Sequence, residues 1–129
     1  MRIEHIAYWV KDLEASKDFF LKYFVMSTSE KYTNTTKNFS SYFLSFEGEN
    51  TRIEIMARPD IQASEISKGH SFGLTHLAIS VGSKEKVDQL TERFRQDGFT
   101  IIGEPRTTGD GYYESIIEDS EGNWIEITE

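Results

Sequence analysis

The sequence predicts an α+β protein built from two similar halves, each a strand, a helix and then about three further strands. Two short repeats lead to this prediction. The octets IEHIAYWV and LTHLAISV share one frame, and their histidines, His5 and His76, are offset by 76 − 5 = 71 residues. Near the end of each half, RIEI resembles WIEI, and the glutamates, Glu54 and Glu126, are offset by 126 − 54 = 72 residues. Each half therefore opens with a strand-borne histidine and closes with a strand-borne glutamate.

The first half is predicted from alternation, helix capping and turn residues. Residues 3–10 alternate and are rich in Ile, Tyr, Trp and Val, which indicates a strand. Asp12 is a favourable N-cap for a helix over about 13–24, because its short carboxylate can accept from the first free backbone N–H groups. The remaining predictions are a polar loop or weak edge strand over 25–38, and a hairpin of strands 39–47 and 51–57 around Gly48-Glu49-Asn50.

The second half repeats this order. Residues 74–81 predict a strand, and Ser83 caps a helix over about 84–97 that ends at Gly98. The remaining predictions are a short strand over 99–103, a hairpin of strands 112–118 and 123–128, and a connection over 59–72 with room for a short helical turn. A half of about 60 residues is marginal alone, so modules of about 1–58 and 73–129 are expected to form one domain over 1–129.

Composition narrows the class of protein. The net charge is −8, with 22 acidic against 14 basic residues, which argues against a nucleic-acid partner because such binding depends on Lys and Arg against phosphates. No apolar run is long enough to cross a membrane, and the chain starts directly with a strand pattern, so neither a membrane partner nor a signal peptide is expected. The absence of cysteine excludes disulfides and thiolate ligands. A cytoplasmic protein with a small-molecule partner is expected.

The four repeated polar residues are predicted to lie on the sheet faces that the helices do not cover. Strand side chains alternate between faces, and the apolar neighbours of each His and Glu would pack on the helices. His5, Glu54, His76 and Glu126 then lie on the faces away from the helices, and two such sheets would curve into a shared cup. Imidazole and carboxylate together suit a divalent ion such as Zn, Ni, Co, Fe or Mn. Such an ion can polarise a carbonyl or stabilise an enediolate, and a ligating glutamate can act as a base.

A plainer interpretation stands beside the metal site. A histidine in a strand is more often structural or exposed than a ligand, and a glutamate in an alternating strand usually faces solvent. Spacing alone leaves both interpretations open, and the matched offsets favour the metal because two His and two Glu rarely repeat by chance. His70 lies in the polar connection without a repeat, so it is interpreted as an exposed loop residue.

Four further residues are candidates for substrate contact. Trp9, Met56 and Trp124 share the ligand-bearing faces and can wall a pocket, although each can equally be a packing residue. Arg106 can hold a substrate carboxylate or phosphate, as can Arg58, but an arginine is by default a surface residue. No strand–GxGxxG–helix fingerprint and no nucleophile-elbow serine is present, so phosphate-loop and serine-nucleophile chemistry are not expected.

At the level of motifs, essentially the whole chain resembles the vicinal oxygen chelate superfamily. That superfamily includes glyoxalase I, bleomycin-resistance proteins, extradiol dioxygenases, fosfomycin-resistance enzymes and methylmalonyl-CoA epimerase. The resemblance rests on IEHIA with VKDLE at the start, GLTHLAI in mid-chain and DSEGNWIEI at the end. The last stretch is similar to the family ending D-P-[DE]-G-N-x-[IL]-E-[IL], with Ser120 in place of Pro.

The resemblance implies paired βαβββ modules whose sheets form a cup around one divalent metal ion, held by His5, Glu54, His76 and Glu126. Glu54 is the informative ligand. Extradiol dioxygenases and fosfomycin-resistance enzymes typically lack a carboxylate there, epimerases often have Gln, and bleomycin-binding proteins lack the metal set. The full set looks most like glyoxalase I, a lyase that isomerises the hemithioacetal of methylglyoxal and a thiol. There the glutamates matching Glu54 and Glu126 bind metal, and the latter is the usual candidate base.

The resemblance also leaves alternatives. A metal-dependent epimerase or dioxygenase would use the same scaffold, and a metal-free protein would sequester a small aromatic or drug-like molecule. Glyoxalase I usually has a basic residue shortly after the first ligand to hold a glutathione carboxylate, whereas Trp9 occupies this stretch. The resemblance therefore leaves open another thiol or another substrate entirely. The family is usually dimeric, so a homodimer is expected.

Overall fold

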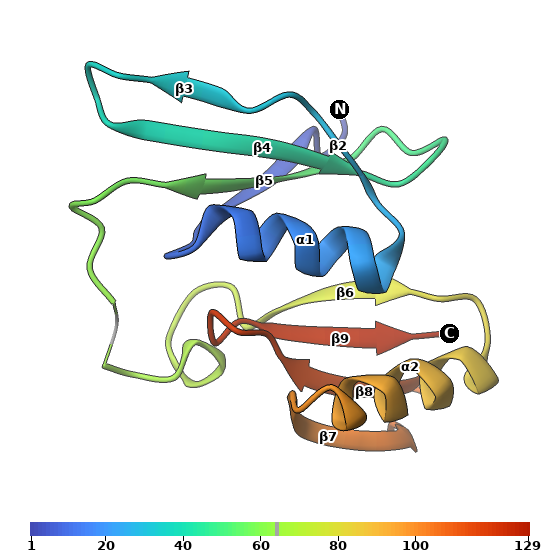
Figure 1. Ribbon diagram of the computed structural model, residues 1–129. Coiled ribbons are helices and arrows are strands. Elements are labelled where there is room, and N and C mark those ends of the chain that lie inside the picture. The colour runs from blue at the N-terminus through green and yellow to red at the C-terminus, as the bar shows by residue number, and fades with distance from the viewer. Residues whose placement is uncertain (64) are drawn as a thin grey trace. The chain divides into compact units, whose positions relative to one another are not determined.

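The computed structural model describes residues 1–63 and 65–129, which form two compact units. The first unit is Met1–Ala63 and the second is Ser64–Glu129. Each contains one long helix and one mixed sheet (Figure 1). The predicted α+β class and its paired modules are confirmed, while the joining of the two units into one cup-shaped domain stays a prediction. Within the described ranges, no helix is long and apolar enough to cross a membrane.

The first unit is a five-stranded sheet with one covering helix. Its strand order is β1-β5-β4-β2, with β3 also paired to β4, and β1 runs parallel to β5 while the other pairs are antiparallel. Helix α1 packs against β4 and β5. The elements are β1 (His5–Trp9), α1 (Leu13–Phe24), β2 (Ser27–Thr28), β3 (Tyr32–Asn34), β4 (Phe39–Ser45) and β5 (Arg52–Ala57).

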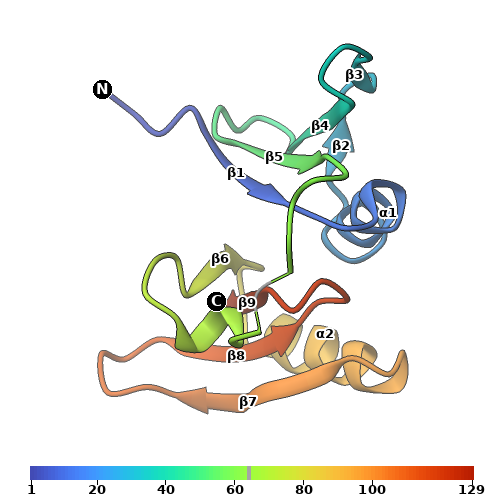
Figure 2. The same cartoon turned by 90° about the vertical axis from the view of Figure 1, so that its left-hand side faces the viewer.

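The second unit repeats this plan with four strands, in the order β6-β9-β8-β7 (Figure 2). Strand β6 runs parallel to β9, and the other pairs are antiparallel. Helix α2 packs against β7, β8 and β9. The elements are the 3-10 turn η1 (Lys68–His70), β6 (His76–Ser80), α2 (Lys84–Gln96), β7 (Thr100–Thr107), β8 (Tyr113–Glu118) and β9 (Trp124–Thr128).

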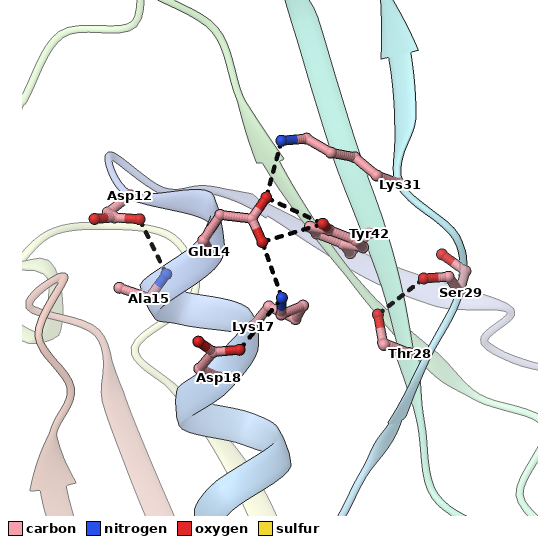
Figure 3. Close-up of polar contacts among 9 residues, drawn as sticks. All are labelled: Asp12, Glu14, Ala15, Lys17, Asp18, Thr28, Ser29, Lys31 and Tyr42. Carbon is pink, nitrogen blue, oxygen red and sulfur yellow. Dashed lines mark hydrogen bonds and ion pairs between the residues drawn. The ribbon is translucent and has the colours of Figure 1, made fainter.

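Both helices begin at the predicted caps. The Asp12 carboxylate accepts from the backbone N–H of Ala15 at 3.0 Å, and the Ser83 hydroxyl accepts from that of Lys86 at 3.3 Å. Each cap satisfies one of the N–H groups that a helix start leaves without an intrahelical partner. Helix α1 is also tied to its sheet by Glu14, whose carboxylate accepts from Tyr42 Oη at 3.0 and 3.1 Å (Figure 3).

The core of each unit lies between its helix and one face of its sheet. Alternation along the closing strands decides which side chains enter it, because successive residues point to opposite faces. On β5 and β9 the isoleucines are buried, and the glutamates between them are not. Burying each such side chain stabilises the fold by about 1.5–3 kcal/mol. The fully buried core side chains include Phe20, Leu44 and Ile55 in the first unit, and Val87, Phe94, Ile117, Ile125 and Ile127 in the second.

Strand β7 differs from its prediction. It extends over Thr100–Thr107 rather than 99–103, with register irregularities between Ile101 and Gly103 and between Gly103 and Arg106. Glycine and Pro105 normally argue against a strand, but β7 is the edge of its sheet, where a bulge and a missing N–H are tolerated. The predicted loop or weak edge strand over 25–38 contains the two short strands β2 and β3.

Candidate metal centre

In the first unit, His5 and Glu54 come together on the face away from α1, here called the ligand face of that unit. The parallel pairing of β1 with β5 sets Ala7 opposite Glu54, so the two candidate ligands are diagonal neighbours. His5 Nε2 lies 3.7 Å from Glu54 Oε2. The imidazole is 39% exposed and the carboxylate 15%, so the pair is reachable from solvent while its carboxylate is largely shielded.

Besides Glu54, the residues Glu4, Phe43 and Arg52 lie around His5. Glu4 contacts His5 Nδ1 with one carboxylate oxygen and Arg52 Nη2 with the other. These hydrogen bonds, first with His5 and then with Arg52, lower the pKa of the Glu4 carboxyl. The Phe43 ring meets the imidazole edge to face at 5.4 Å, and the Arg52 guanidinium lies 4.0 Å from the Phe43 centroid. A proton on Nδ1 donated to Glu4 leaves the Nε2 lone pair facing Glu54, the tautomer that a metal ligand needs.

The second unit contains the equivalent pair. Strand β6 pairs with β9 so that Ala78 lies opposite Glu126, and His76 Nε2 lies 3.4 Å from Glu126 Oε2. The exposed fractions, 38% and 15%, match those of the first pair. The ligand face of this unit carries alternate residues of three strands: His76, Ala78 and Ser80; Trp124, Glu126 and Thr128; and Glu114, Ile116 and Glu118.

The donor atoms of each pair suit a shared divalent ion. Ligand bonds of about 2.1 Å at octahedral or tetrahedral angles separate two donor atoms by about 3.0–3.4 Å. The observed separations of 3.4 and 3.7 Å are close to this range. Among residues 1–63 and 65–129, no group of three or more potential ligands gathers around one point. Each unit thus supplies two donors, and joining them into a four-ligand site stays a prediction.

Trp124 sits beside His76 in the cross-strand register, and the turn η1 covers its ring. A Cβ added to Gly69 would lie 2.2 Å from the Trp124 ring atoms, so only glycine permits this approach. The His70 ring meets the indole edge to face at 4.9 Å. His70 is exposed, as predicted from the sequence, but this contact with Trp124 was not foreseen. A substrate contact for Trp124 stays a prediction.

A polar network anchors this turn. Lys68 Nζ donates to the Glu121 carbonyl at 2.8 Å and to Asn123 Oδ1 at 3.0 Å. The buried Asp119 carboxylate in turn accepts from the backbone N–H groups of Glu121 and Asn123 and from Asn123 Nδ2. Burial raises the pKa of Asp119, while these hydrogen bonds act to lower it. The hairpin loop and η1 are therefore held as one polar assembly beside Trp124.

Glu114 is the residue that sequence reasoning missed on the ligand face. It is buried on β8, and burial together with the Glu126 carboxylate raises the pKa of its carboxyl, against the opposing influence of Arg106. The alternation ESIIE held a signal for its orientation, because Ser115 contacts α2 through Thr91 at 2.6 Å and so turns Glu114 the other way. Only the cross-strand register places it near Glu126.

The remaining predicted contacts lie where alternation places them. Trp9 and Met56 are opposite each other across β1 and β5, on the ligand face of the first unit. The Trp9 ring meets Phe39 edge to face at 6.0 Å and has the Arg58 guanidinium 5.5 Å from its centroid. Arg106 lies opposite Glu114 across β7 and β8, and its Nη2 is 3.6 Å from Glu114 Oε1. Contact of any of these residues with a substrate stays a prediction.

Comparison with known proteins finds relatives that match nearly the whole of this chain. The chain is 29% identical to the uncharacterized protein YqjT of Bacillus subtilis (strain 168), over 97% of this chain and 96% of that protein. It is 28% identical to lactoylglutathione lyase GLX1 of Arabidopsis thaliana, over 98% of this chain but only 43% of the plant protein. The chain thus spans less than half the length of that named lyase.

Solved structures share the fold. The glyoxalase family protein from Enterococcus faecalis superposes with a TM-score of 0.79 at 22% identity, covering 99% of this chain and 97% of its own. Glyoxalase I from Zea mays gives a TM-score of 0.80 at 23% identity, covering 98% of this chain and 44% of its own. The family model described as Glyoxalase/Bleomycin resistance protein/Dioxygenase superfamily matches residues 2–127, which confirms the resemblance predicted from the motifs. By that match and by its fold, the chain belongs to this superfamily.

Proposed function

We propose that this protein is a metal-dependent lyase of the glyoxalase I type, which isomerises the hemithioacetal of a 2-oxoaldehyde and a thiol. The observation that carries the proposal is the matched pair of His–Glu contacts, at 3.7 Å in the first unit and 3.4 Å in the second. The relation to a plant protein named lactoylglutathione lyase supports it. A carboxylate at position 54, where the resembled epimerases often have Gln, favours this reaction over epimerisation.

One Ni, Zn, Co, Mn or Fe ion would be held by four residues, His5, Glu54, His76 and Glu126. When bound, the ion would polarise neighbouring carbonyl and hydroxyl oxygens and stabilise an enediolate. Glu4 orients the His5 imidazole through Nδ1. Glu126 takes the proton from the hydroxyl-bearing carbon of the substrate and returns it to the adjacent carbon, so no net proton is consumed. Glu54 is the second catalytic carboxylate, and Trp9, Met56, Trp124 and Arg106 contact the substrate.

A homodimer in the cytoplasm completes the proposal. Large apolar side chains at the start of the second unit are exposed, among them Phe72 and Leu74, and such side chains are commonly covered by a partner. Light scattering on the metal-loaded protein tests this part. A dimer is expected at micromolar concentration, and a monomer alone would contradict it.

The reaction is tested on the purified full chain, free of any tag. Metal content is measured after incubation with Ni, Co, Zn or Mn, and methylglyoxal is then supplied with several thiols while thioester absorbance is followed. One bound ion, a raised Tm and thioester formation with at least one thiol are expected. Substoichiometric metal with no change in Tm would instead favour a metal-free binding protein. That alternative draws on the aromatic group of Trp9, Phe39 and Tyr32 in the first unit.

A further inference from the structure

Arg52 lies beside His5 on the ligand face of the first unit, and the metal site proposed above gives it no role. The β1–β5 register sets the two residues opposite each other. The Arg52 guanidinium contacts Glu4 Oε1 through Nη2, and its central carbon lies 4.0 Å from the centroid of the Phe43 ring. Glu4 and Phe43 each contact the His5 imidazole in turn. Arg52 is therefore connected to His5 by two routes.

The first route runs through the Glu4 carboxylate. One of its oxygens contacts Arg52, and the other contacts His5 Nδ1. The backbone is joined at the same place, because the Arg52 N–H donates to the Glu4 carbonyl at 3.0 Å. The Glu4 side chain is 49% exposed, so without these contacts its carboxylate would be free to turn into solvent. The charge-assisted hydrogen bond to the guanidinium holds it at Nδ1 instead.

The second route runs through the Phe43 ring. The guanidinium lies over this ring, and the His5 imidazole meets it at 5.4 Å with an angle of 88° between the two planes. A cation over a ring face and an edge-to-face pair of rings are both favourable arrangements. The β4–β5 register sets Phe43 opposite Glu54, the carboxylate that faces His5 Nε2. The ring therefore packs against the imidazole beside its metal-binding nitrogen.

The second unit keeps the His–Glu pair but replaces all three supporting residues. The equivalent positions hold uncharged residues: Trp124 opposite His76, Ile116 opposite Glu126, and Thr75 before His76. The three central strands are nevertheless ordered alike, β1-β5-β4 in one unit and β6-β9-β8 in the other. The strand order therefore does not depend on Glu4, Arg52 and Phe43, and what these residues add concerns His5.

We propose that Arg52 is a positioning residue of the metal site, which fixes the His5 imidazole through Glu4 and Phe43 with its proton on Nδ1 and its Nε2 lone pair toward Glu54. This role rests on the proposed function, because it takes His5 as a metal ligand. A neutral imidazole binds metal through its unprotonated nitrogen, and the hydrogen bond at the other nitrogen decides which one that is. The first unit then presents its imidazole in the binding form before an ion arrives.

The tautomer of His5 in the metal-free full chain tests this role directly. Long-range proton–nitrogen NMR spectra of nitrogen-15-labelled protein record it at a pH at which the imidazoles are neutral, and His5→Gln assigns the signals. Wild type should carry the proton on Nδ1. Arg52→Gln should shift His5 toward a mixture of both tautomers and leave His76 unchanged. Arg52→Lys should be intermediate, because lysine keeps the charge beside Glu4 but not the planar guanidinium.

Metal affinity, measured by competition with a chromophoric chelator, gives a second readout. Arg52→Gln should weaken binding about threefold to tenfold, less than the loss of a direct partner of the imidazole. A guanidinium that acted only by its charge would have the opposite effect, since removing a cation favours a divalent ion. In a protein that already carries Glu4→Gln, Arg52→Gln should weaken binding by less than about twofold, because the route through Glu4 is gone. Arg95→Gln is the matched control, since Arg95 also pairs with glutamates but lies in the second unit.

The positioning role and the proposed reaction fail in different ways. An unchanged His5 tautomer in Arg52→Gln, a tighter binding of metal, or an equal loss in Arg95→Gln would overturn the role of Arg52. If Arg52→Gln does not fold, Arg52→Lys decides the matter by the same two measurements. A shifted tautomer in a protein that converts no hemithioacetal would reject the reaction and leave the positioning of the imidazole intact. Thioester formation with an unchanged tautomer would do the reverse.

Discussion

The two units carry the same His–Glu pair in different surroundings. His5 is contacted by the Glu4 carboxylate and packs edge to face with the Phe43 ring, so hydrogen bonding and ring packing both orient it. His76 lies beside Trp124, whose ring is covered by Gly69 and His70. A repeat can therefore preserve two candidate ligands while each copy supports them with different neighbours. In the first unit the Glu4 carboxylate orients the imidazole. The second unit instead places the covered Trp124 ring beside its histidine and the Arg106–Glu114 ion pair on the same face.

Replacing the two glutamates should change turnover to very different extents. Glu126→Gln keeps the size and one oxygen ligand but removes the basic carboxylate, so turnover should fall about a hundredfold or more, the usual scale for a positioned general base. Glu54→Gln should retain metal and lose less activity. Steady-state kinetics with metal analysis of both variants measure the difference. Full turnover in Glu126→Gln with a confirmed substrate would remove this residue from the role of base.

The two hairpin loops should contribute differently to the free energy of unfolding. Asp119→Ala leaves three N–H donors near Asn123 without their acceptor, and unfolding free energy should fall by about 2 kcal/mol. Glu47 stands at the equivalent place in the first unit and is exposed, so Glu47→Ala should change stability by less than about 0.5 kcal/mol. Urea unfolding of both variants measures the contrast. A loss in Asp119→Ala as small as the one expected for Glu47→Ala would show that the buried network adds nothing to stability.

A smaller effect concerns the support of the first imidazole. Glu4→Gln removes the carboxylate that accepts from His5 Nδ1, and such partners of metal-bound histidines are worth about tenfold or more in metal affinity. Thr75 precedes His76 as Glu4 precedes His5, so Thr75→Val is the matched control and should leave affinity unchanged. Competition with a chromophoric chelator measures both. If the two variants bind metal equally well, Glu4 does not position His5.

The smallest effect is on acid stability. Hydrogen bonds from Lys31 and then Lys17 hold the pKa of Glu14 at about 2 (Figure 3). A depressed carboxyl pKa stabilises the folded state above the ordinary value of 4.5, and this contribution disappears as the pH falls through about 2. Glu14→Gln should therefore flatten the fall in stability between these pH values. The effect should be small because the group is exposed to solvent.

Thermal unfolding as a function of pH tests this contrast. Glu85 stands at the equivalent helix position in the second unit, where its pKa is lowered by its own backbone N–H and by Ser83. Glu85→Gln should change the acid limb less than Glu14→Gln, because no lysine is hydrogen-bonded to it among the described residues. A larger change in Glu85→Gln would mean that the lysines around Glu14 do not stabilise the first unit.

Local signals in the sequence predicted much of the fold. Helix α1 has the predicted bounds, because Asp12 provides a cap and the chain turns into the left-handed region at Val25. Both His–Glu pairs were predictable, since the repeat fixes the face of each residue and the parallel pairing brings them together. The predicted strand ended too early, at residue 103, because Gly103 and Pro105 are residues that normally interrupt strands. Only the sheet topology shows that β7 is an edge strand, which accommodates them.

The supporting residues were not predictable from one strand at a time. Glu4 contacts both His5 and Arg52, and the β1–β5 register is needed to show that Arg52 lies beside His5. Glu114 is hidden in the same way, because the register between β8 and β9 is needed to place it near Glu126. Alternation gives the face of a side chain but not its neighbours on the next strand. The residues that position the candidate ligands could therefore be identified only once the strand pairing was known, whereas the candidate ligands themselves could be identified from the sequence.

The distribution of tryptophan gives each unit its own optical reporter. The chain has two tryptophans, Trp9 in the first unit and Trp124 in the second. In a protein with Trp9→Phe the tryptophan emission would come only from the second unit, and in one with Trp124→Phe only from the first. Unfolding curves of the two single-tryptophan proteins would reveal whether both copies of the repeat melt in one cooperative step or in sequence.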